Sequence, residues 1–229
     1  MNVEPLILAI ETATLAGSIS ISKGEHVIGS SEGDPTLSHS NTLLADVDKL
    51  LVSTNLKVDE VDVFAVAAGP GSFTGLRIGI ATIKALATTL DRPCVGVATL
   101  EAIAHAAGSH SRIVGVLPAG RGEVFCQMFT TSAGRVKSLD DPAHLSPGRM
   151  LELYGQVDDL VWAGSGAKLY SQLINEFVAP RVASFSEPPV NLARHVASLA
   201  LLELGTGANY STNELRAIYV RPSDAELKF

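Results

Sequence analysis

The sequence has few aromatic residues, few cysteines, no excess of basic residues and no long apolar run. Aromatic residues make up 5% of the 229 positions, whereas 46% of the positions are hydrophobic. A sizeable core is therefore possible, but aliphatic side chains and alanine have to build it. This composition argues against a disordered chain and suits helices packed closely on a sheet.

The charge balance excludes one class of function. The formal net charge is −7, whereas a protein that holds nucleic acid by itself usually carries a basic surface. Any RNA that this protein serves is therefore expected to be bound mainly by a partner.

Cysteine content and hydropathy bear on the cellular compartment. Cys94 and Cys126 are the two cysteines, and their spacing fits neither a metal site nor a redox motif. Met1–Ile10 contains no Lys or Arg, unlike the start of a secretory signal. No segment approaches the roughly 20 apolar residues that span a bilayer. We expect buried, reduced thiols in a cytoplasmic protein.

The first half of the chain alternates apolar segments with helical patterns. The segments expected as strands, of which the first three form a meander, are Leu6–Ile10, Gly17–Ser22, His26–Ser31, Val61–Ala68 and Pro93–Val97. Helical spacing covers Ser40–Ser53, with Ser40 or Asn41 as its cap, and Gly75–Thr89. Strands that alternate with helices indicate an α/β lobe.

The second half repeats this organisation more loosely. The expected strands are Arg112–Leu117, Glu123–Thr130 and Asp159–Ala163, and the expected helices are Ala167–Phe177 and Leu192–Leu204. The turn Gly164-Ser165-Gly166 joins a strand to a helix. We predict two α/β lobes, residues 1–106 and 107–229, each a mixed sheet covered by helices. The final helix could pack back on the first lobe.

The segment Gly69–Gly79 reads GPGSFTGLRIG and links a buried strand to a helix that Ser72 or Thr74 could cap. One interpretation is an anion-binding loop at a helix start, but the lysine of a P-loop and the spacing of a dinucleotide fingerprint are absent. The favoured interpretation is a tight turn followed by a cap. The signature-loop residues are Gly69, Pro70, Gly71, Ser72, Phe73, Thr74, Gly75 and Arg77.

The helix expected over Gly75–Thr89 has few polar side chains on any face. Such a helix has to bury more than one face. Small residues at Gly75, Gly79, Ala81 and Ala85 would let another backbone approach closely. We expect an interface with another protein there, and the alternative is that the second lobe covers this helix.

Candidate catalytic chemistry is sparse. Glu11 follows the first strand, where a metal- or phosphate-handling carboxylate could lie, although a solvated or turn-bonding side chain is the favoured interpretation. The histidines lack the spacing that places two metal ligands on one helix face, and no serine or cysteine stands in a nucleophile motif. We therefore predict no catalytic residue, no metal and no cofactor.

These motifs resemble the TsaB family, also called YeaZ, of the acetate kinase, sugar kinase, Hsp70 and actin superfamily. The segments that carry the resemblance are ILAIETAT (Ile7–Thr14), GPGSFTGLRIG (Gly69–Gly79), CVGVATLEAI (Cys94–Ile103), RGEVF (Arg121–Phe125) and AIYVR (Ala217–Arg221). The resemblance implies two actin-like ATPase lobes of the ribonuclease H-like type. It spans nearly the whole chain.

The resemblance also implies a function. The chain would be a non-catalytic scaffold or activator for the formation of N6-threonylcarbamoyladenosine at position 37 of tRNA. It would bind and support the catalytic subunit TsaD, which uses threonylcarbamoyl-adenylate, together with the small ATPase TsaE. A homodimer is possible in isolation, and contact with tRNA would be indirect.

Replaced residues favour the non-catalytic assignment. In TsaD-like enzymes two metal-binding histidines stand at the positions of Thr99 and Ile103, and neither replacement is a good metal ligand. The resemblance places Glu11 where the family usually has Asp, and Pro118-Ala119-Gly120 where it has Asp-Ala-Arg. Both departures argue against tight binding of ATP and magnesium, and the M22 peptidase label of this group lacks support.

In the family, the first two helices pair with their counterparts on TsaD or on a second copy. By position, the expected partner-binding residues or their immediate support are Leu43, Val47, Leu76, Ile80 and Ile83. Glu11 would be a vestigial nucleotide or metal position. The alternative functions are an ATP-dependent kinase or ligase of the same superfamily and, more weakly, a peptidase.

Overall fold

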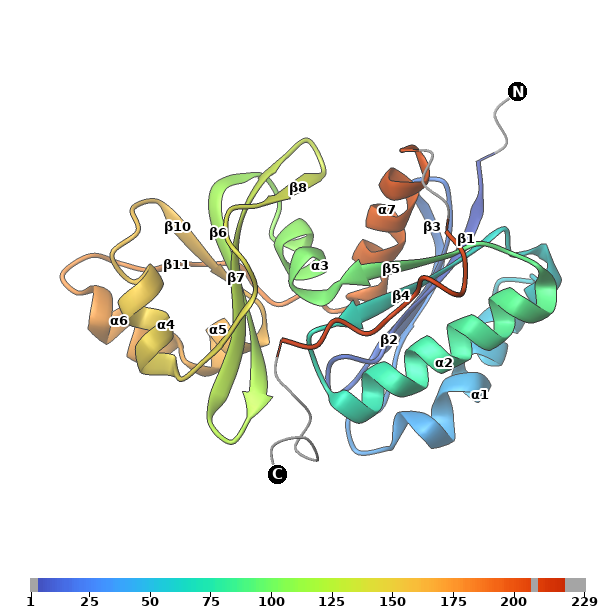
Figure 1. Ribbon diagram of the computed structural model, residues 1–229, viewed down its shortest axis with the longest axis horizontal. Coiled ribbons are helices and arrows are strands. Elements are labelled where there is room, and N and C mark those ends of the chain that lie inside the picture. The colour runs from blue at the N-terminus through green and yellow to red at the C-terminus, as the bar shows by residue number, and fades with distance from the viewer. Residues whose placement is uncertain (1–3, 207–209, 221–229) are drawn as a thin grey trace. The chain divides into compact units, whose positions relative to one another are not determined.

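The computed structural model describes residues 4–206 and 210–220 of the chain (Figure 1). The described residues divide into two compact units, residues 4–99 with 190–206 and 210–218, and residues 100–189 with 219–220. The lobe limits drawn from the sequence, 1–106 and 107–229, differ from this division in α3 (Thr99–Ala106) and in the return of residues 190–218 to the first unit.

The first unit contains a mixed sheet in the order β3-β2-β1-β4-β5. Its strands are β1 (Leu6–Glu11), β2 (Ser18–Lys23), β3 (His26–Glu32), β4 (Val63–Gly69) and β5 (Cys94–Ala98). The first three form the predicted antiparallel meander, whereas β4 runs parallel to both β1 and β5. The apolar run of β1 is buried along its whole length, as expected for a strand covered on both faces.

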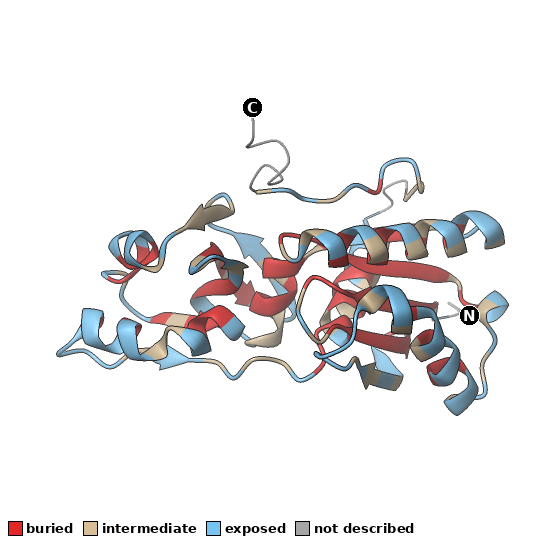
Figure 2. Cartoon of the chain, turned by 90° about the horizontal axis from the view of Figure 1, so that it is seen from below, coloured by how far each residue is buried: buried red, intermediate tan, exposed pale blue. Residues whose placement is uncertain are grey.

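Helices cover both faces of this sheet. On one face lie α1 (His39–Ser53) and α2 (Phe73–Leu90), and on the other lies α7 (Ala193–Leu204), as Figure 1 shows. A short 3-10 helix, η1 (Val58–Glu60), precedes β4. Leucine, isoleucine and valine side chains of β1, β2, β4, α1 and α2 form one core, to which Leu215 of the C-terminal segment also belongs. Figure 2 shows these strands as the buried layer of the unit.

Helix α7 packs on a face of small residues. Ser18, Ser20 and Ser22 of β2 are all buried, and α7 contacts β2 as well as β1. The Ala193 amide, in the first turn of α7, donates a 3.0 Å hydrogen bond to Ser18 Oγ. Ala193, Ala197 and Ala200 are among the buried residues of α7, and small side chains on the helix and on β2 allow the two elements to approach closely.

The second unit contains another mixed sheet, in the order β11-β10-β6-β7-β8, with β9 paired to β7. The strands are β6 (His110–Gly120), β7 (Glu123–Ser132), β8 (Arg135–Ser138), β9 (Ala143–Leu145), β10 (Leu160–Ala163) and β11 (Ser184–Phe185). The helices besides α3 are α4 (Pro147–Tyr154), α5 (Ser165–Leu169) and α6 (Ser171–Val178). Their core is centred on Trp162 and Tyr154.

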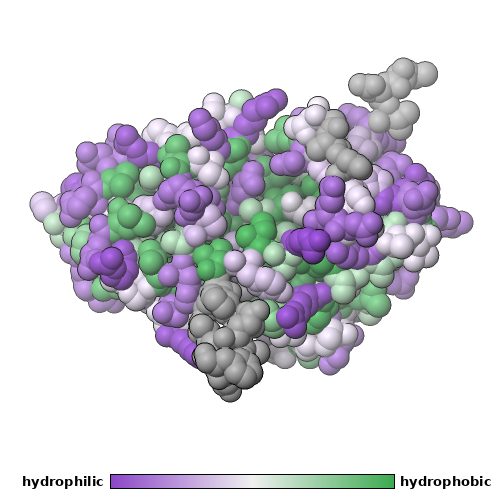
Figure 3. Space-filling model, in the orientation of Figure 1, coloured by the Kyte–Doolittle hydropathy of each residue, from purple (hydrophilic) through white to green (hydrophobic). Residues whose placement is uncertain are grey.

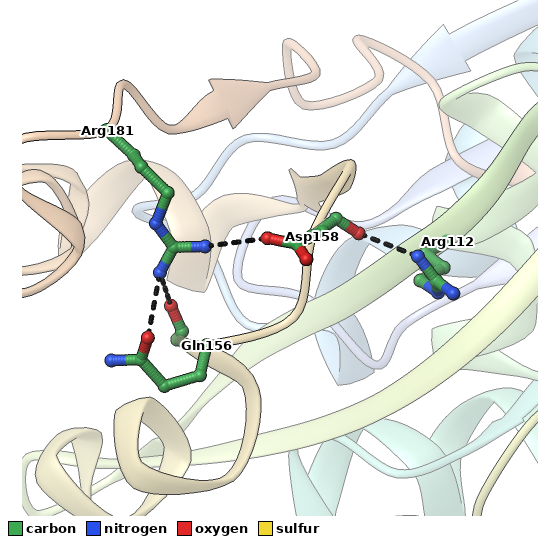
Figure 4. Close-up of polar contacts among 5 residues, drawn as sticks. Arg112, Gln156, Asp158 and Arg181 are labelled. Carbon is green, nitrogen blue, oxygen red and sulfur yellow. Dashed lines mark hydrogen bonds and ion pairs between the residues drawn. The ribbon is translucent and has the colours of Figure 1, made fainter.

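A polar cluster fixes the turn that leads into β10 (Figure 4). Arg181 donates to the Gly155 carbonyl at 2.7 Å and to Gln156 Oε1 at 3.1 Å, and it pairs with Asp158 at 3.3 Å. Arg112 donates to the Asp158 carbonyl at 3.0 Å. Because Arg181 follows α6, this cluster joins the segment after α6 to the turn between α4 and β10.

Most predicted elements are confirmed, with three corrections. Helix α1 begins at His39 with Ser38 in the cap position, so the predicted cap at Ser40 or Asn41 is wrong. Helix α2 begins at Phe73, two residues before the predicted start. The single helix predicted over Ala167–Phe177 is two helices, because α5 ends at Leu169 and α6 begins at Ser171.

Candidate functional site

The signature loop lies at the carboxyl end of β4 and is closed by the C-terminal segment. Gly69 has a φ of +125°, which favours glycine, and a side-chain carbon there would overlap the backbone of Ile218. The Ile218 amide donates to the Ala68 carbonyl at 2.7 Å. Pro70 is buried beside them. The first glycine of the motif is thus required by close backbone packing.

The next glycines of the motif bring α2 against the turn after β1. A side-chain carbon at Gly71 would lie 2.6 Å from the Ala13 carbonyl oxygen, and the Ser72 amide donates to that oxygen at 2.8 Å. At Gly75 and Gly79, an added carbon would overlap the carbonyl or the hydroxyl of Thr12. These glycines therefore let a helix and a strand end touch through their backbones.

The polar groups of the loop are used within the protein. Thr12 Oγ1 donates to the Gly75 carbonyl at 2.8 Å, and Ser72 Oγ accepts from the Gly75 amide at 3.2 Å. The predicted cap by Ser72 is confirmed, whereas Thr74 is exposed. The guanidinium of Arg77 lies 3.8 Å over the ring of Phe73. This geometry supports the turn-and-cap interpretation over an anion-binding loop.

Glu11 is buried and its carboxylate is occupied by hydrogen bonds. The side chain is 1% exposed; Oε1 accepts from the Thr14 amide at 2.6 Å, and Oε2 accepts from Thr14 Oγ1 at 2.8 Å and from Ser18 Oγ at 3.4 Å. Burial raises the pKa of Glu11, and the bonds from Thr14 oppose that shift. Of the interpretations open from the sequence, the turn-bonding one fits this geometry.

Ile103 and Thr99 occupy the two positions that, by the resemblance, hold metal-binding histidines in TsaD-like enzymes. Ile103 is buried and packs near Gly115 and Gly164. Thr99 is fully buried, and its Oγ1 has no hydrogen-bond partner among the described residues. Over residues 4–206 and 210–220, no three His, Cys, Asp or Glu side chains come close enough together to hold a metal ion.

The predicted partner-binding residues all lie on the buried sides of α1 and α2. Each is at most 9% exposed; they are Leu43, Val47, Leu76, Ile80 and Ile83. All except Leu76 belong to the core cluster of the first unit described above. Their burial fits the supporting role that the sequence left open for them, rather than direct contact with another molecule. The surface that a partner could touch is the opposite side of α1 and α2.

We call this opposite side the outer face of α1 and α2. On α1 it includes Leu44, 65% exposed, and Val52, 72% exposed. On α2 it consists of exposed residues at helical spacing, namely Thr74, Arg77, Ala81, Ala85 and Thr88. Figure 3 shows weakly polar and apolar residues over α2, interspersed with charged ones.

In the sequence, Ala81 and Ala85 stand out as small residues, but hydrophobicity favours their larger neighbours as candidates for the contact or its support. Steps of three or four residues from Gly75 lead to the buried positions Gly79 and Ile83, whereas the same steps from Ala81 lead to the exposed positions Ala85 and Thr88. The helical period therefore separates the buried face of α2 from the outer face. A turn-bonding Glu11 was among the predictions, but its link to His39 through Thr14 was not, because no local pattern relates these three residues.

Comparison with known proteins points to one family. The family model of TsaD, tRNA N6-adenosine threonylcarbamoyltransferase, matches residues 36–215. The chain is 28% identical over 178 residues to the tRNA threonylcarbamoyladenosine biosynthesis protein TsaB of Bacillus subtilis, which covers 76% of this chain and 77% of that protein. The match to the Haemophilus influenzae protein of the same name is 26% identical over 227 residues, covering 94% and 93%.

Solved structures are also similar to this chain, one of them in both sequence and fold. YeaZ from Pseudomonas aeruginosa superposes with a TM-score of 0.79 at 26% identity, covering 94% of this chain and 99% of that chain. The activator of the 2-hydroxyisocaproyl-CoA dehydratase from Clostridium difficile, with bound ADPNP, superposes with a TM-score of 0.52 at 13% identity, covering 93% and 99%. The second likeness is one of fold alone.

Proposed function

Because this chain belongs to the TsaB (YeaZ) family, which includes the tRNA threonylcarbamoyladenosine biosynthesis proteins of Bacillus subtilis and Haemophilus influenzae, we propose that it serves this biosynthesis as a non-catalytic subunit. In this role it binds and supports the catalytic threonylcarbamoyltransferase, TsaD. Family membership also assigns its two units, each a mixed sheet covered by helices, to the actin-like ATPase fold.

The observation that carries the proposal is the outer face of α1 and α2. Two large apolar side chains, Leu44 and Val52, are mostly exposed on α1. On α2, which is 18 residues long, Ala81 and Ala85 leave the helix backbone accessible to a close neighbour. A helix of that length extends about 27 Å, enough to form one side of an interface of standard size.

The site chemistry supports a subunit rather than an enzyme. Glu11, the residue best placed to handle a metal or phosphate, has its carboxylate oxygens bonded to Thr14 and Ser18. The signature loop uses its amides and glycines to pack α2 on the turn after β1. Neither arrangement favours an ATP-dependent kinase or ligase.

The remaining parts of the proposal concern partners and location. TsaE would be the third member of the complex, tRNA would be held mainly by TsaD because the chain is acidic, and two copies would pair through the same outer face when TsaD is absent. We place the protein in the cytoplasm with the tRNA. Within the described residues, no helix is long and apolar enough to cross a membrane.

The proposal is tested by measuring the affinity of the chain for TsaD by calorimetry. Ala85→Glu places a charge in the centre of the outer face of α2, where burial without a partner weakens binding by a factor of about 100 or more. Leu202→Glu on α7, which lies on the other side of the sheet, is the matched control and should bind as the wild type does. Equal affinity of all three proteins would move the interface elsewhere, and no binding by the wild type would refute the proposal.

A further inference from the structure

The turn after β1 links the buried carboxylate of Glu11 to the first helix. Both carboxylate oxygens of Glu11 accept hydrogen bonds from Thr14, one from its amide and one from its hydroxyl. The Thr14 hydroxyl also accepts a 3.3 Å bond from the Gly17 amide, which closes the turn. The carboxylate therefore sets the conformation of residues 12–17 and the direction of the Thr14 carbonyl.

That carbonyl is bonded by a residue of α1. The Nε2 atom of His39, the first residue of α1, lies 3.1 Å from the Thr14 carbonyl oxygen. Because a carbonyl oxygen only accepts, this contact requires a proton on Nε2. The contact joins residues that are 25 positions apart in the sequence.

The first turn of α1 has little else to fix it. Ser38 stands in the cap position, but its side chain makes no capping hydrogen bond to the described residues and instead lies 2.9 Å from Ser40 Oγ. Caps from Ser, Thr, Asp or Asn normally stabilise a helix start. Here the imidazole of His39 provides an anchor from within the helix to the sheet.

Gly17 completes the arrangement. Its φ is +69°, and a side-chain carbon there would lie 2.7 Å from Cε1 of the His39 ring. A side chain at position 17 would therefore collide with the ring whose Nε2 contacts Thr14. Two other acidic residues, Glu32 and Asp46, line the same hollow as Glu11 and His39.

We infer that Glu11 and His39 are positioning residues for partner binding: Glu11 fixes the turn at Thr14, and the turn holds the first turn of α1 in place through His39. The inference rests on the proposed function, because α1 carries Leu44 of the outer face five residues after His39. Glu11, which stands where a carboxylate could bind a metal or phosphate, thus orients α1 instead.

The experiment compares His39→Leu with His39→Gln in the full chain. Glutamine can present its amide nitrogen where Nε2 lies, whereas leucine cannot donate. We expect His39→Leu to speed hydrogen exchange of the amides of residues 43–46 and to weaken TsaD binding, each about tenfold, which corresponds to the loss of one hydrogen bond. His39→Gln should restore both to within about threefold of the wild type.

Glu11→Gln tests the other half of the link. It removes the charge and one acceptor without changing the shape of the side chain. The amides of residues 43–46 should therefore exchange faster than in the wild type, as they do in His39→Leu. The amides of residues 50–53, in the last turn of α1, are the internal control and should not change.

The two proposals fail in distinguishable ways. Unaltered exchange at residues 43–46 in both His39→Leu and Glu11→Gln would overturn the positioning role, even if the wild type binds TsaD tightly. Faster exchange combined with unchanged TsaD affinity would show that α1 is anchored but that its position does not matter for binding, which also overturns the inference. Absence of wild-type binding would refute the proposed function, while the exchange data would still report on the anchor.

Discussion

Substituting Gly75 by alanine tests whether the signature loop is a packing motif. The added methyl group would overlap the Thr12 carbonyl oxygen and lie within 3.2 Å of Ser72 Oγ. The neighbour on one side is backbone of the turn after β1, which cannot rotate away as a flexible side chain does. The start of α2 would therefore have to shift away from β1.

The expected loss of stability follows from three contributions. Overpacking costs about 1–3 kcal/mol, and loss of the bond from Thr12 Oγ1 to the Gly75 carbonyl costs about 1 kcal/mol more. Replacing glycine by alanine in a helix recovers about 1 kcal/mol. The net destabilisation is about 2 kcal/mol, which lowers the melting temperature by roughly 4–8 °C for a protein of this size.

The assay is thermal unfolding followed by circular dichroism, with Gly148→Ala as the matched control. Gly148 lies in the first turn of α4, and an added carbon there meets nothing within 4 Å. The control should be neutral or stabilised by about 0.5 kcal/mol. If Gly75→Ala were as stable as Gly148→Ala, the packing explanation of the motif would be refuted.

Two further predictions concern buried polar groups. Ser22 is buried in β2, and its hydroxyl has no partner among the described residues, so Ser22→Ala should raise the free energy of unfolding by about 1 kcal/mol in urea titrations; a destabilised variant would contradict this. Burial, with help from the nearby charge of Asp140, raises the pKa of Cys126 to about 12. In the unfolded chain the thiol loses its proton near its ordinary pKa, whereas in the folded protein it keeps the proton to a higher pH. The contribution of Cys126 to the free energy of unfolding is therefore fully present below about pH 9 and is lost as the pH rises towards 12. Wild-type protein should therefore lose stability more steeply than Cys126→Ser between pH 9 and 11, and parallel pH profiles would count against this.

The strands and long helices could be predicted because their signals are local. The continuous apolar run of β1 and the helical period of α1, α2 and α7 lie within single segments. The residues buried in the structure repeat with the same patterns. The break between α5 and α6 was missed because the apolar period continues across Tyr170, where the backbone leaves the helical region.

The candidate site was predictable in position but not in orientation. The sequence identified the segment that carries the signature loop and the two helices of the proposed interface, but hydrophobicity selected Leu76 and Ile80, which are buried. On α2, the residues of the outer face are small or polar, so hydrophobicity alone does not select them. The link from Glu11 to His39 depends on the fold of the turn after β1, for which no periodic signal exists.

The central claim, that the chain supports TsaD without performing the transfer itself, is tested most directly by a transfer assay. Purified chain, TsaD, TsaE, tRNA and threonylcarbamoyl-adenylate labelled in its threonyl group are combined, and incorporation of the label into tRNA is measured with each protein omitted in turn. We predict no incorporation by the chain alone and a loss of turnover when the chain is omitted or replaced by Ala85→Glu. Incorporation by the chain in the absence of TsaD would contradict the account.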